Sequence, residues 1–297
     1  MVPQRTANPS ILVFGATGQL GRALQGRAPD RIVSVTRQDL DLRLAPQLIE
    51  GVIARSGAGA VINAAAYTHV DLAEAEPESA YAVNAEAPAL MARACAALGL
   101  PLIHISTDYV FAGDQPGARA EADPAEPASL YGQSKLAGEQ AVLAACPQAL
   151  VVRTSWLVSE QGSNFVRTML SLAGRTDRLR IVGDQQGVPT DADALAAFLL
   201  TAADRLGADT APTAGLLHFR NDGDPITWAA FAAAIFDQSG GPRPAIDVIT
   251  SAEYGARAPR PANSLLSIDR LKQAWGYEPP SWRSGLDRIL AALRTAD

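Results

Sequence analysis

The chain has 297 residues and a formal net charge of −6, and this length favours one large domain with a smaller one appended. An acidic chain without a basic stripe offers no surface for nucleic acid and no attraction to an anionic membrane. No apolar run is long enough for a signal peptide or a membrane span, and Cys95 and Cys146 lack metal or disulfide spacing, so we expect a cytoplasmic protein with core thiols.

The first predicted unit is a strand, a tight turn and a helix. Ile11–Phe14 is an apolar run typical of a buried parallel strand, and a helical spacing begins after the turn. Gly15 permits the turn, Gly18 allows an anion to approach the backbone, and Gly21 lets the helix pack tightly on its strand. Backbone N–H groups and the positive end of the helix dipole meet there, as at a pyrophosphate site. The G-x-x-G-x-x-G spacing alone is a weak signal, and a structural turn is the alternative.

A β-branched run over residues 31–37 predicts the second strand, and its end bears on the choice of cofactor. In dinucleotide-binding folds a carboxylate at this point binds the adenosine ribose and repels a 2′-phosphate. Thr36 and Arg37 stand here instead, with Asp39 and Asp41 further on. The pattern therefore favours NADPH, with NADH as the other nicotinamide to test. The alternative is that Arg37 is a plain surface residue.

A helix is expected over residues 45–55 and a third strand over Ala60–Asn63, followed by the small residues Ala64, Ala65 and Ala66. Small side chains after a strand let a flat ligand pass close to the backbone, so these alanines are candidates for a cofactor wall. Tight packing of strand on helix explains them equally well. The next helix starts with acidic residues that we interpret as solvated charges favourable to the helix dipole, namely Asp71, Glu74, Glu76 and Glu78.

A helix over residues 79–98 leads to a fourth strand that begins at residue 101. His104 lies in its apolar part and is expected to be a core histidine. Ser106, Thr107 and Asp108 follow, at the end of the strand where open α/β sheets bind ligands. A hydroxyl and a carboxylate there can bind a substrate carbonyl and its neighbouring hydroxyls. Polar capping of the strand end is the alternative.

Beyond a loop rich in Pro, Gly, Asp and Glu, the segment Tyr131-Gly-Gln-Ser-Lys135 opens a helix. Residues four apart share a helix face, so the phenol hydroxyl and the ammonium can converge. Only two of the 25 Lys and Arg residues are lysines, which makes a lysine at this spacing an unusual coincidence. A pair on the helix surface is the alternative.

Acid–base chemistry explains why these two residue types would be paired. A phenol with a pKa of about 10 is a slow acid or base near neutrality. The Lys135 ammonium stabilises a phenolate, so we expect it to bring the pKa of Tyr131 closer to the working pH. The compact charge of a lysine can do this while donating to a cofactor ribose, whereas a guanidinium is bulkier and planar.

The remainder of the chain continues to alternate strands and helices, so the sequence predicts an α/β fold. A strand from residue 150 ends near Trp156, which could stack on a sugar or base or roof the core. Ser163 is expected to cap a helix that runs to residue 173. A proline-stiffened loop carries Arg257 and Arg260, which could reach a diphosphate or be solvated. Further elements are expected at residues 179–182, 191–206, 215–219, 227–238, 245–250, 268–275 and 282–293.

Motifs along nearly the whole chain resemble those of the extended short-chain dehydrogenase/reductases, and in detail those of the dTDP-4-dehydrorhamnose reductase branch. The glycine turn and the Tyr131/Lys135 pair specify only the superfamily. Three segments are more selective for the branch, namely Ser106-Thr-Asp-Tyr-Val-Phe111, Arg153-Thr-Ser-Trp156 and Gly183-Asp-Gln-Gln-Gly-Val-Pro-Thr190.

This resemblance implies a fold and a reaction. The fold is a Rossmann-type doubly wound parallel sheet with a smaller C-terminal α/β substrate domain. Residues 1–157, joined by about 190–222, would bind the dinucleotide, and residues 158–189 and 223–297 would bind the substrate. The implied reaction is the NADPH-dependent reduction of the C4 ketone of dTDP-4-dehydro-6-deoxy-L-mannose to dTDP-L-rhamnose.

The resemblance also implies roles for single residues. Thr107, Tyr131 and Lys135 would be the catalytic set. Thr107, Asp108 and Trp156 would contact the sugar nucleotide. The cofactor would be held by Gly15, Gly18, Gln19, Leu20, Gly21, Arg37, Asp41, Leu42, Ala64, Ala65, Tyr67, Tyr131 and Lys135. Some relatives bind magnesium at a dimer interface through a glutamate on the first helix; Ala23 stands at the matching position, so the resemblance does not extend to magnesium, and a homodimer stays open.

Two rival functions remain at this point. An NDP-sugar epimerase or dehydratase of the same superfamily would need a further acid or base and would keep its nicotinamide bound. A non-catalytic regulatory subunit, such as that of methionine adenosyltransferase, would have no use for an intact set of Thr107, Tyr131 and Lys135.

Overall fold

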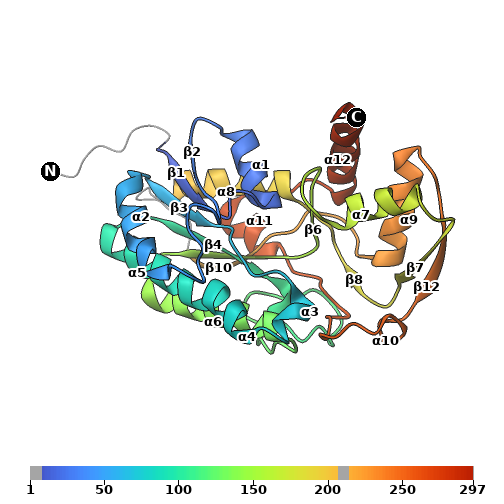
Figure 1. Cartoon of the computed structure of the whole chain (residues 1–297), viewed down its shortest axis with the longest axis horizontal. Coiled ribbons are helices and arrows are strands. Elements are labelled where there is room, and N and C mark those ends of the chain that lie inside the picture. Colours follow the sequence, from blue (N-terminus) through green and yellow to red (C-terminus); the bar gives the residue numbers. More distant parts are fainter. Residues whose placement is uncertain (1–8, 207–213, 297) are drawn as a thin grey trace.

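A six-stranded parallel sheet forms the centre of the computed structural model, which describes residues 9–206 and 214–296 (Figure 1). Its strand order is β10-β5-β4-β3-β1-β2, and every neighbouring pair is parallel. The strands are β1 (Ile11–Phe14), β2 (Ile32–Val35), β3 (Ala60–Asn63), β4 (Leu102–Thr107), β5 (Leu150–Thr154) and β10 (Gly215–His218). The chain leaves β1 on one side for β2 and returns on the other side for β3. The predicted doubly wound sheet is therefore confirmed, and its switch point, where such sheets bind ligands, lies between β1 and β3.

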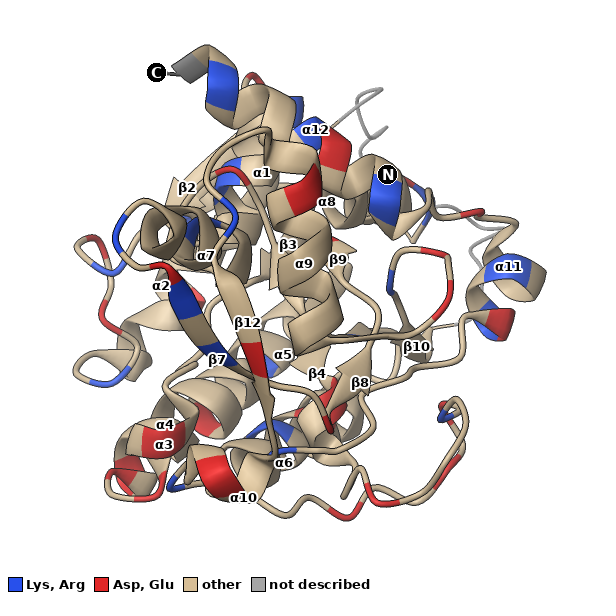
Figure 2. Ribbon diagram, turned by 90° about the vertical axis from the view of Figure 1, so that its right-hand side faces the viewer, with Lys and Arg blue, Asp and Glu red and all other residues tan. Residues whose placement is uncertain are grey.

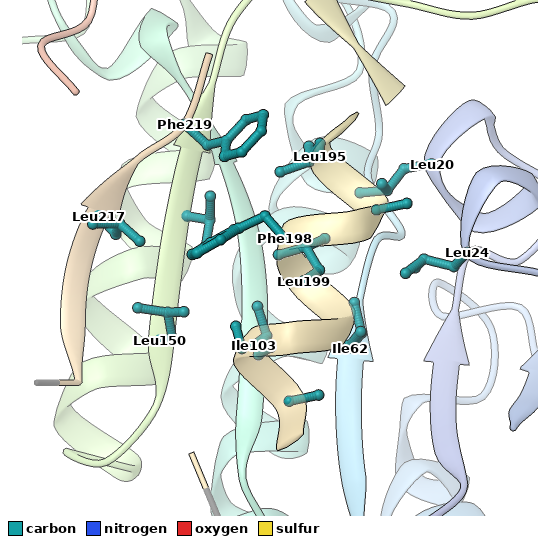
Figure 3. Packing of buried hydrophobic residues seen from close by; sticks show 14 of the residues in the cluster. Leu20, Leu24, Ile62, Ile103, Leu150, Leu195, Phe198, Leu199, Leu217 and Phe219 are labelled. Atoms are coloured by element: carbon teal, nitrogen blue, oxygen red, sulfur yellow. The ribbon is translucent and has the colours of Figure 1, made fainter. Parts of the chain in front are cut away.

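Helices cover both faces of this sheet. One face packs against α1 (Gln19–Arg27), α8 (Ala192–Arg205) and α11 (Asp269–Trp275), and the other against α2 (Ile49–Ser56), α5 (Ala87–Leu98) and α6 (Leu130–Ala145). Figure 3 shows the first face, where Phe198 and Leu199 of α8 pack against strand residues such as Ile103. These side chains are at most 1% exposed, and removal of their apolar surface from water stabilises the fold.

A smaller lobe has a separate hydrophobic core and faces the viewer in Figure 2. It is built from α7 (Phe165–Ala173), α9 (Trp228–Ser239), α12 (Trp282–Ala296) and the parallel pair β7 (Arg178–Val182) and β12 (Ala245–Ile249). The remaining short elements are η1 (Pro46–Leu48), α3 (Val70–Ala73), α4 (Pro77–Tyr81), η2 (Ala82–Glu86), η3 (Asp108–Val110), β6 (Leu157–Val158), β8 (Gln186–Gly187), β9 (Thr190–Asp191), β11 (Ile226–Thr227) and α10 (Ser251–Tyr254).

The helix α11 does not pack where the sequence places it. The predicted domain division assigns it to the smaller domain, but Leu271 and Trp275 are buried in the core of the main sheet. Trp275 packs edge-on against Phe198 of α8, with ring centroids 5.3 Å apart. The chain thus returns to the main sheet once more before α12, because burial of Leu271 and Trp275 in this core removes their apolar surface from water.

The single helix predicted over residues 79–98 is broken into three parts. A π-helical turn, η2, separates α4 from α5. Inside this turn the Asn84 side chain accepts a hydrogen bond from the Tyr67 backbone N–H (2.9 Å) and donates to the Ser134 hydroxyl (3.0 Å). Gly138 of α6 lies against the Asn84 carbonyl, where a Cβ would collide with it. The extra residue in the turn therefore serves a buried contact with α6, a pattern that helical periodicity cannot reveal.

The start of α7 also differs by one residue from the prediction. Asn164, not Ser163, is the N-cap, and its side-chain oxygen accepts from the Arg167 backbone N–H at 3.2 Å. Its amide also donates to the Ser159 carbonyl, which fixes the preceding loop and explains why the amide is chosen over the hydroxyl. Across residues 9–206 and 214–296, no helix combines the length and the apolar character needed to cross a membrane.

Candidate active site

A cavity of about 1030 Å³ runs along the carboxyl ends of β1, β3, β4 and β5. Its lining includes all but one of the residues predicted to bind cofactor or substrate or to act in catalysis. These are Gly15, Gly18, Gln19, Leu20, Arg37, Asp41, Leu42, Ala64, Ala65, Tyr67, Thr107, Asp108, Tyr131, Lys135 and Trp156. Gly21 is the exception. The structure therefore gathers in one cavity residues that lie as far apart in the sequence as Gly15 and Trp156.

The glycine turn leaves no room for side chains. Gly15 has a φ of +80°, and a Cβ there would lie 2.6 Å from the Ala65 nitrogen and 2.8 Å from the Ala64 carbonyl. Gly18 is the N-cap residue of α1 and lines the cavity, so the free N–H groups of the first helical turn lie at the end of the helix next to the cavity. A Cβ at Gly21 would meet the Gly15 carbonyl, so Gly21 keeps the helix close to the strand. The packing roles predicted for Gly15 and Gly21 match this geometry.

Charged residues form the rim of the cavity beyond β2. The Arg37 side chain is 67% exposed, and its Nε lies 3.1 Å from the Asp41 carboxylate. Arg43 pairs with the same carboxylate at 3.0 Å and also lines the cavity. Two guanidinium groups share one carboxylate, so the rim keeps a surplus of positive charge. Arg43 is not among the predicted site residues, although it stands only six residues after Arg37.

Thr107, Tyr131 and Lys135 meet on one wall of the cavity. Thr107 ends β4, and Tyr131 and Lys135 lie one turn apart at the start of α6, which Ser129 caps through a hydrogen bond from the Gly132 backbone N–H. All three are at least 90% buried. The Lys135 ammonium donates to the Ile105 carbonyl at 2.7 Å, so the neighbouring strand β4 fixes its position.

The expected effect of Lys135 on the Tyr131 phenol is wrong for this structure. Burial raises the pKa of Tyr131 to about 12, and the nearby Asp108 charge adds to the rise, while a hydrogen bond with Thr107 opposes it. Burial also lowers the pKa of Lys135 to about 8. The sequence argument considered the Lys135 charge and left out the burial of the phenol, which is the largest cause of the shift and acts in the opposite direction. Tyr131 is therefore a protonated phenol at neutral pH, the form that can donate a proton.

Asp108 is a buried carboxyl group at the end of β4. Its Oδ1 accepts a hydrogen bond from the Thr107 hydroxyl at 3.1 Å, and its Oδ2 has no hydrogen-bond partner in the described part of the chain. Burial raises the pKa of Asp108 to about 6, although the nearby Ser264 hydroxyl and the hydrogen bond from Thr107 oppose the rise. A buried acceptor without a partner is costly, so this oxygen is suited to receive a hydroxyl donor from a ligand.

Trp156 lies between the cavity and the smaller lobe. It lines the cavity, and one face of its indole stacks on Trp228 of α9, with ring centroids 3.5 Å apart and an interplanar angle of 11°. Its φ of 48° is the only positive value of a non-glycine residue in the described part of the chain. Gly187 lies at the indole edge, where a Cβ would be 2.8 Å away. Contacts from the smaller lobe therefore hold Trp156 in a backbone conformation that costs about 1–3 kcal/mol.

Three of the acidic residues interpreted as solvated charges have partners. Asp71 accepts from the Ala258 backbone N–H at 2.9 Å and pairs with Arg260 at 2.7 Å. Glu74 accepts from the Leu130 backbone N–H, and Glu76 accepts from the Tyr67 hydroxyl, both at 2.9 Å. These carboxylates therefore have protein donors, while the Asp71 side chain is still 48% exposed and Glu76 is exposed, so both also remain in contact with solvent as interpreted. Arg260 does not line the cavity.

The histidine at the centre of β4 behaves as predicted. His104 is fully buried, and its Nδ1 lies 3.0 Å from the side-chain nitrogen of Asn63. Burial and the neighbouring Lys135 charge hold the pKa of His104 well below its ordinary value, so the ring is neutral. Within residues 9–206 and 214–296, no group of three or more His, Cys, Asp or Glu residues could hold a metal ion.

Known proteins resemble this chain over almost its whole length. A family model described as the RmlD substrate binding domain matches residues 9–295. The dTDP-4-dehydrorhamnose reductase of Sinorhizobium fredii is 40% identical over 289 residues, covering 95% of this chain and 97% of the relative. The protein of the same name from Salmonella typhimurium is 34% identical over 300 residues, covering 96% and 98%. A crystal structure of the Bacillus anthracis dTDP-4-dehydrorhamnose reductase in complex with NADP has a TM-score of 0.90 at 33% identity, covering 96% of this chain and 100% of that one.

Proposed function

The chain belongs to the RmlD substrate binding domain family, and from this premise we propose that it reduces the C4 ketone of dTDP-4-dehydro-6-deoxy-L-mannose to dTDP-L-rhamnose with NADPH. The observation that carries the proposal is the meeting of Thr107, Tyr131 and Lys135 on one wall of the cavity that begins at the glycine turn. The relatives from Sinorhizobium fredii and Salmonella typhimurium, which match 95% and 96% of this chain, are named dTDP-4-dehydrorhamnose reductases.

The residues at the β1 end of the cavity fit a dinucleotide. At Gly15 any side chain would strike the backbone of Ala64 and Ala65, so this end is shaped for a ligand that lies against main chain. The N-terminus of α1 would receive the pyrophosphate, because its free N–H groups and its dipole favour an anion. Arg37 and Arg43 would receive the 2′-phosphate that distinguishes NADPH from NADH. NADPH supplies the hydride when bound.

The protein's part in the chemistry is to hold and protonate the ketone oxygen. The Thr107 hydroxyl, which donates to Asp108 in this structure, would turn to donate to the carbonyl, and the Tyr131 phenol would give its proton to the oxygen as that atom becomes an alkoxide. The high pKa of Tyr131 keeps this proton available at neutral pH. Lys135, fixed by the Ile105 carbonyl, would donate to the cofactor ribose and favour the phenolate that forms.

Recognition of the sugar nucleotide would fall to Asp108 and Trp156. The unpartnered Asp108 oxygen is placed to accept from a sugar hydroxyl. The Trp156 face that is not covered by Trp228 offers an apolar surface to the sugar or base. We further propose that residues 158–189 and 223–297, without α11, form the substrate lobe, because their side chains make the separate core behind Trp228.

The test is to mix purified protein with NADPH and dTDP-4-dehydro-6-deoxy-L-mannose and to follow the loss of reduced-nicotinamide absorbance. We expect stoichiometric oxidation of NADPH and formation of dTDP-L-rhamnose. Isomerised or dehydrated sugar without net NADPH consumption would instead identify an epimerase or dehydratase. Lack of reduction together with a stoichiometric protein partner recovered by pull-down would identify a regulatory subunit.

A further inference from the structure

We propose that the buried ion pair between Glu139 and Arg153 positions Lys135: Arg153 occupies both oxygens of the Glu139 carboxylate, which leaves the Lys135 ammonium free to face the cavity. This inference rests on the proposed function of Lys135 and adds two residues to it. Neither Glu139 nor Arg153 lines the cavity, so both would act through Lys135 and not on the substrate.

The ion pair between Arg153 and Glu139 is bidentate and shielded from solvent. The Arg153 Nε and Nη2 atoms donate to the two Glu139 oxygens at 2.8 and 2.6 Å. Both side chains are 2% exposed. Arg153 comes from β5, and its guanidinium also lies over the Phe111 ring, 5.0 Å from the centroid. A planar guanidinium suits this arrangement because it can hold two oxygens at once, which an ammonium cannot.

Glu139 lies where it could otherwise capture Lys135. The two residues are four apart on α6 and share a face of the helix, and the Glu139 charge acts on Lys135 through the buried space between them. Lys135 is 1% exposed and donates to the Ile105 carbonyl. Without Arg153, the carboxylate would be an unpaired buried anion one helical turn from a buried ammonium. Their direct pairing would then draw the ammonium away from the carbonyl that directs it.

Stability alone does not explain the pair. Removing two charges from water costs more than many buried ion pairs return, and apolar residues often replace them without loss. The Arg153 Nη1 atom, moreover, has no hydrogen-bond partner among the described residues. A costly arrangement that lies one helical turn from Lys135 is better explained by what it does to that lysine.

The charges around Lys135 predict opposite effects for the two partners. Facing it are Tyr131 and Glu139 from its own helix, the neutral His104 from β4, and Asp108 beyond the end of that strand, with Arg153 behind Glu139. Burial lowers the pKa of Lys135 to about 8, and the Glu139 charge opposes this. Loss of Glu139 removes the anion and leaves a second cation nearby, which lowers this pKa further. Loss of Arg153 frees the anion, which raises it.

The experiment measures kcat/KM for NADPH oxidation, and separately the Kd of NADPH by fluorescence, against pH in the full-length protein. Lys135 acts in its charged form, so the wild-type value falls as the pH rises past about 8. We expect this alkaline limb to move down by about one pH unit in Glu139→Gln and up by about one unit in Arg153→Met. In Arg153→Met the KM for NADPH also rises. In the double variant Glu139→Gln/Arg153→Met, the pH of the alkaline limb should lie between the values of the two single variants.

The test includes a matched control variant and a second pair of more conservative substitutions. Arg288→Met breaks another ion pair with a buried carboxylate, that of Asp191, and should leave the limb in place. If either main variant fails to fold, Glu139→Asp and Arg153→Lys should move the limb in the same opposite directions by smaller amounts. Limbs that stay fixed, or that move in the same direction, would overturn the proposal. The Kd arm reports on Lys135 even if the wild type reduces no dTDP-sugar, so failure of the proposed function is recognised separately.

Discussion

The two walls of the cavity are built from different materials. The wall proposed to bind the cofactor, here called the cofactor wall, consists of Gly15, Gly18, Ala64 and Ala65, where main chain and methyl groups face the cavity. The wall proposed to bind the substrate, here called the substrate wall, consists of side chains from α6 and the ends of β4 and β5, namely Thr107, Asp108, Tyr131, Lys135 and Trp156. The first wall leaves room for a ligand close to the backbone, and the second presents polar and aromatic side chains to the cavity.

This difference decides which substitutions each wall tolerates. An added methyl group should damage the cofactor wall, because the gap at Gly15 is smaller than a carbon atom requires. A removed atom should damage the substrate wall, because each group there has its own chemical task. Substitutions chosen accordingly should separate cofactor binding from catalysis.

The largest effect is expected on the substrate wall, from Tyr131→Phe. Removal of one hydroxyl deletes the proton donor, and kcat should fall by about 10²–10⁴-fold. The NADPH affinity, measured by fluorescence titration, should stay within about twofold, since the ring and its packing against Tyr109 remain. Tyr277→Phe, a loss of hydroxyl from a tyrosine in the main core, is the control and should leave kcat unchanged. Near-normal turnover of the Tyr131 variant would refute the assignment.

The counterpart on the cofactor wall is Gly15→Ala. A φ of +80° and a backbone nitrogen 2.6 Å from the new Cβ should weaken NADPH binding by about 10–100-fold, from strain of about 1–3 kcal/mol. Binding of NADPH by calorimetry measures this directly. Gly26→Ala in α1 is the matched control, because a Cβ there meets nothing within 4 Å. It should bind NADPH normally and gain up to about 1 kcal/mol in unfolding free energy. Equal behaviour of the two variants would contradict the description of the cofactor wall.

The two walls also differ in how far the sequence reveals them. The glycine turn and the Tyr131/Lys135 spacing are local patterns, so they can be recognised from residues that are close together in the sequence. The alternation of strands and helices predicts an α/β fold, and the doubly wound sheet is implied by the family resemblance. By contrast, the stack of Trp156 on Trp228 joins residues 72 positions apart, and no local sequence pattern predicts it.

Long-range contacts set several features that the sequence did not predict. The pKa of Tyr131 depends on burial by elements that close over it, which a helical spacing cannot report. Asp71 finds its partners Ala258 and Arg260 almost 190 positions further along the chain. The Asn84 turn departs from a regular helix because of Gly138 on another helix. In each case the decisive contact comes from a distant part of the sequence.

A smaller effect is expected at the rim, where the cofactor wall does use side chains. Arg37→Ala should raise the KM for NADPH by about tenfold while leaving that for NADH nearly unchanged, because only the 2′-phosphate loses a charge-assisted hydrogen bond. Steady-state kinetics with both cofactors measures the ratio. Arg178→Ala is the control, since Arg178 is equally exposed and also pairs with an aspartate, on the smaller lobe. An equal rise in the KM for NADH would show that Arg37 does not bind the 2′-phosphate.

The smallest effect should come from behind the substrate wall. Trp228 does not line the cavity but supports the strained Trp156, and such aromatic pairs contribute about 0.5–1.5 kcal/mol. Trp228→Ala should therefore raise the KM for the sugar nucleotide by about 2–10-fold, with kcat and the KM for NADPH little changed. Trp228→Phe keeps a ring for stacking and should recover most of the affinity.

The control is Trp275→Phe, the same substitution as Trp228→Phe but in the core of the main sheet, which should leave both KM values unchanged. If Trp228→Ala lowered kcat as much as it raised the KM, Trp156 would be placing the ketone for reaction and not only holding the sugar. The substrate wall would then extend into the smaller lobe as a part of the chemistry. A KM effect confined to the sugar nucleotide would limit the stack of Trp156 on Trp228 to recognition.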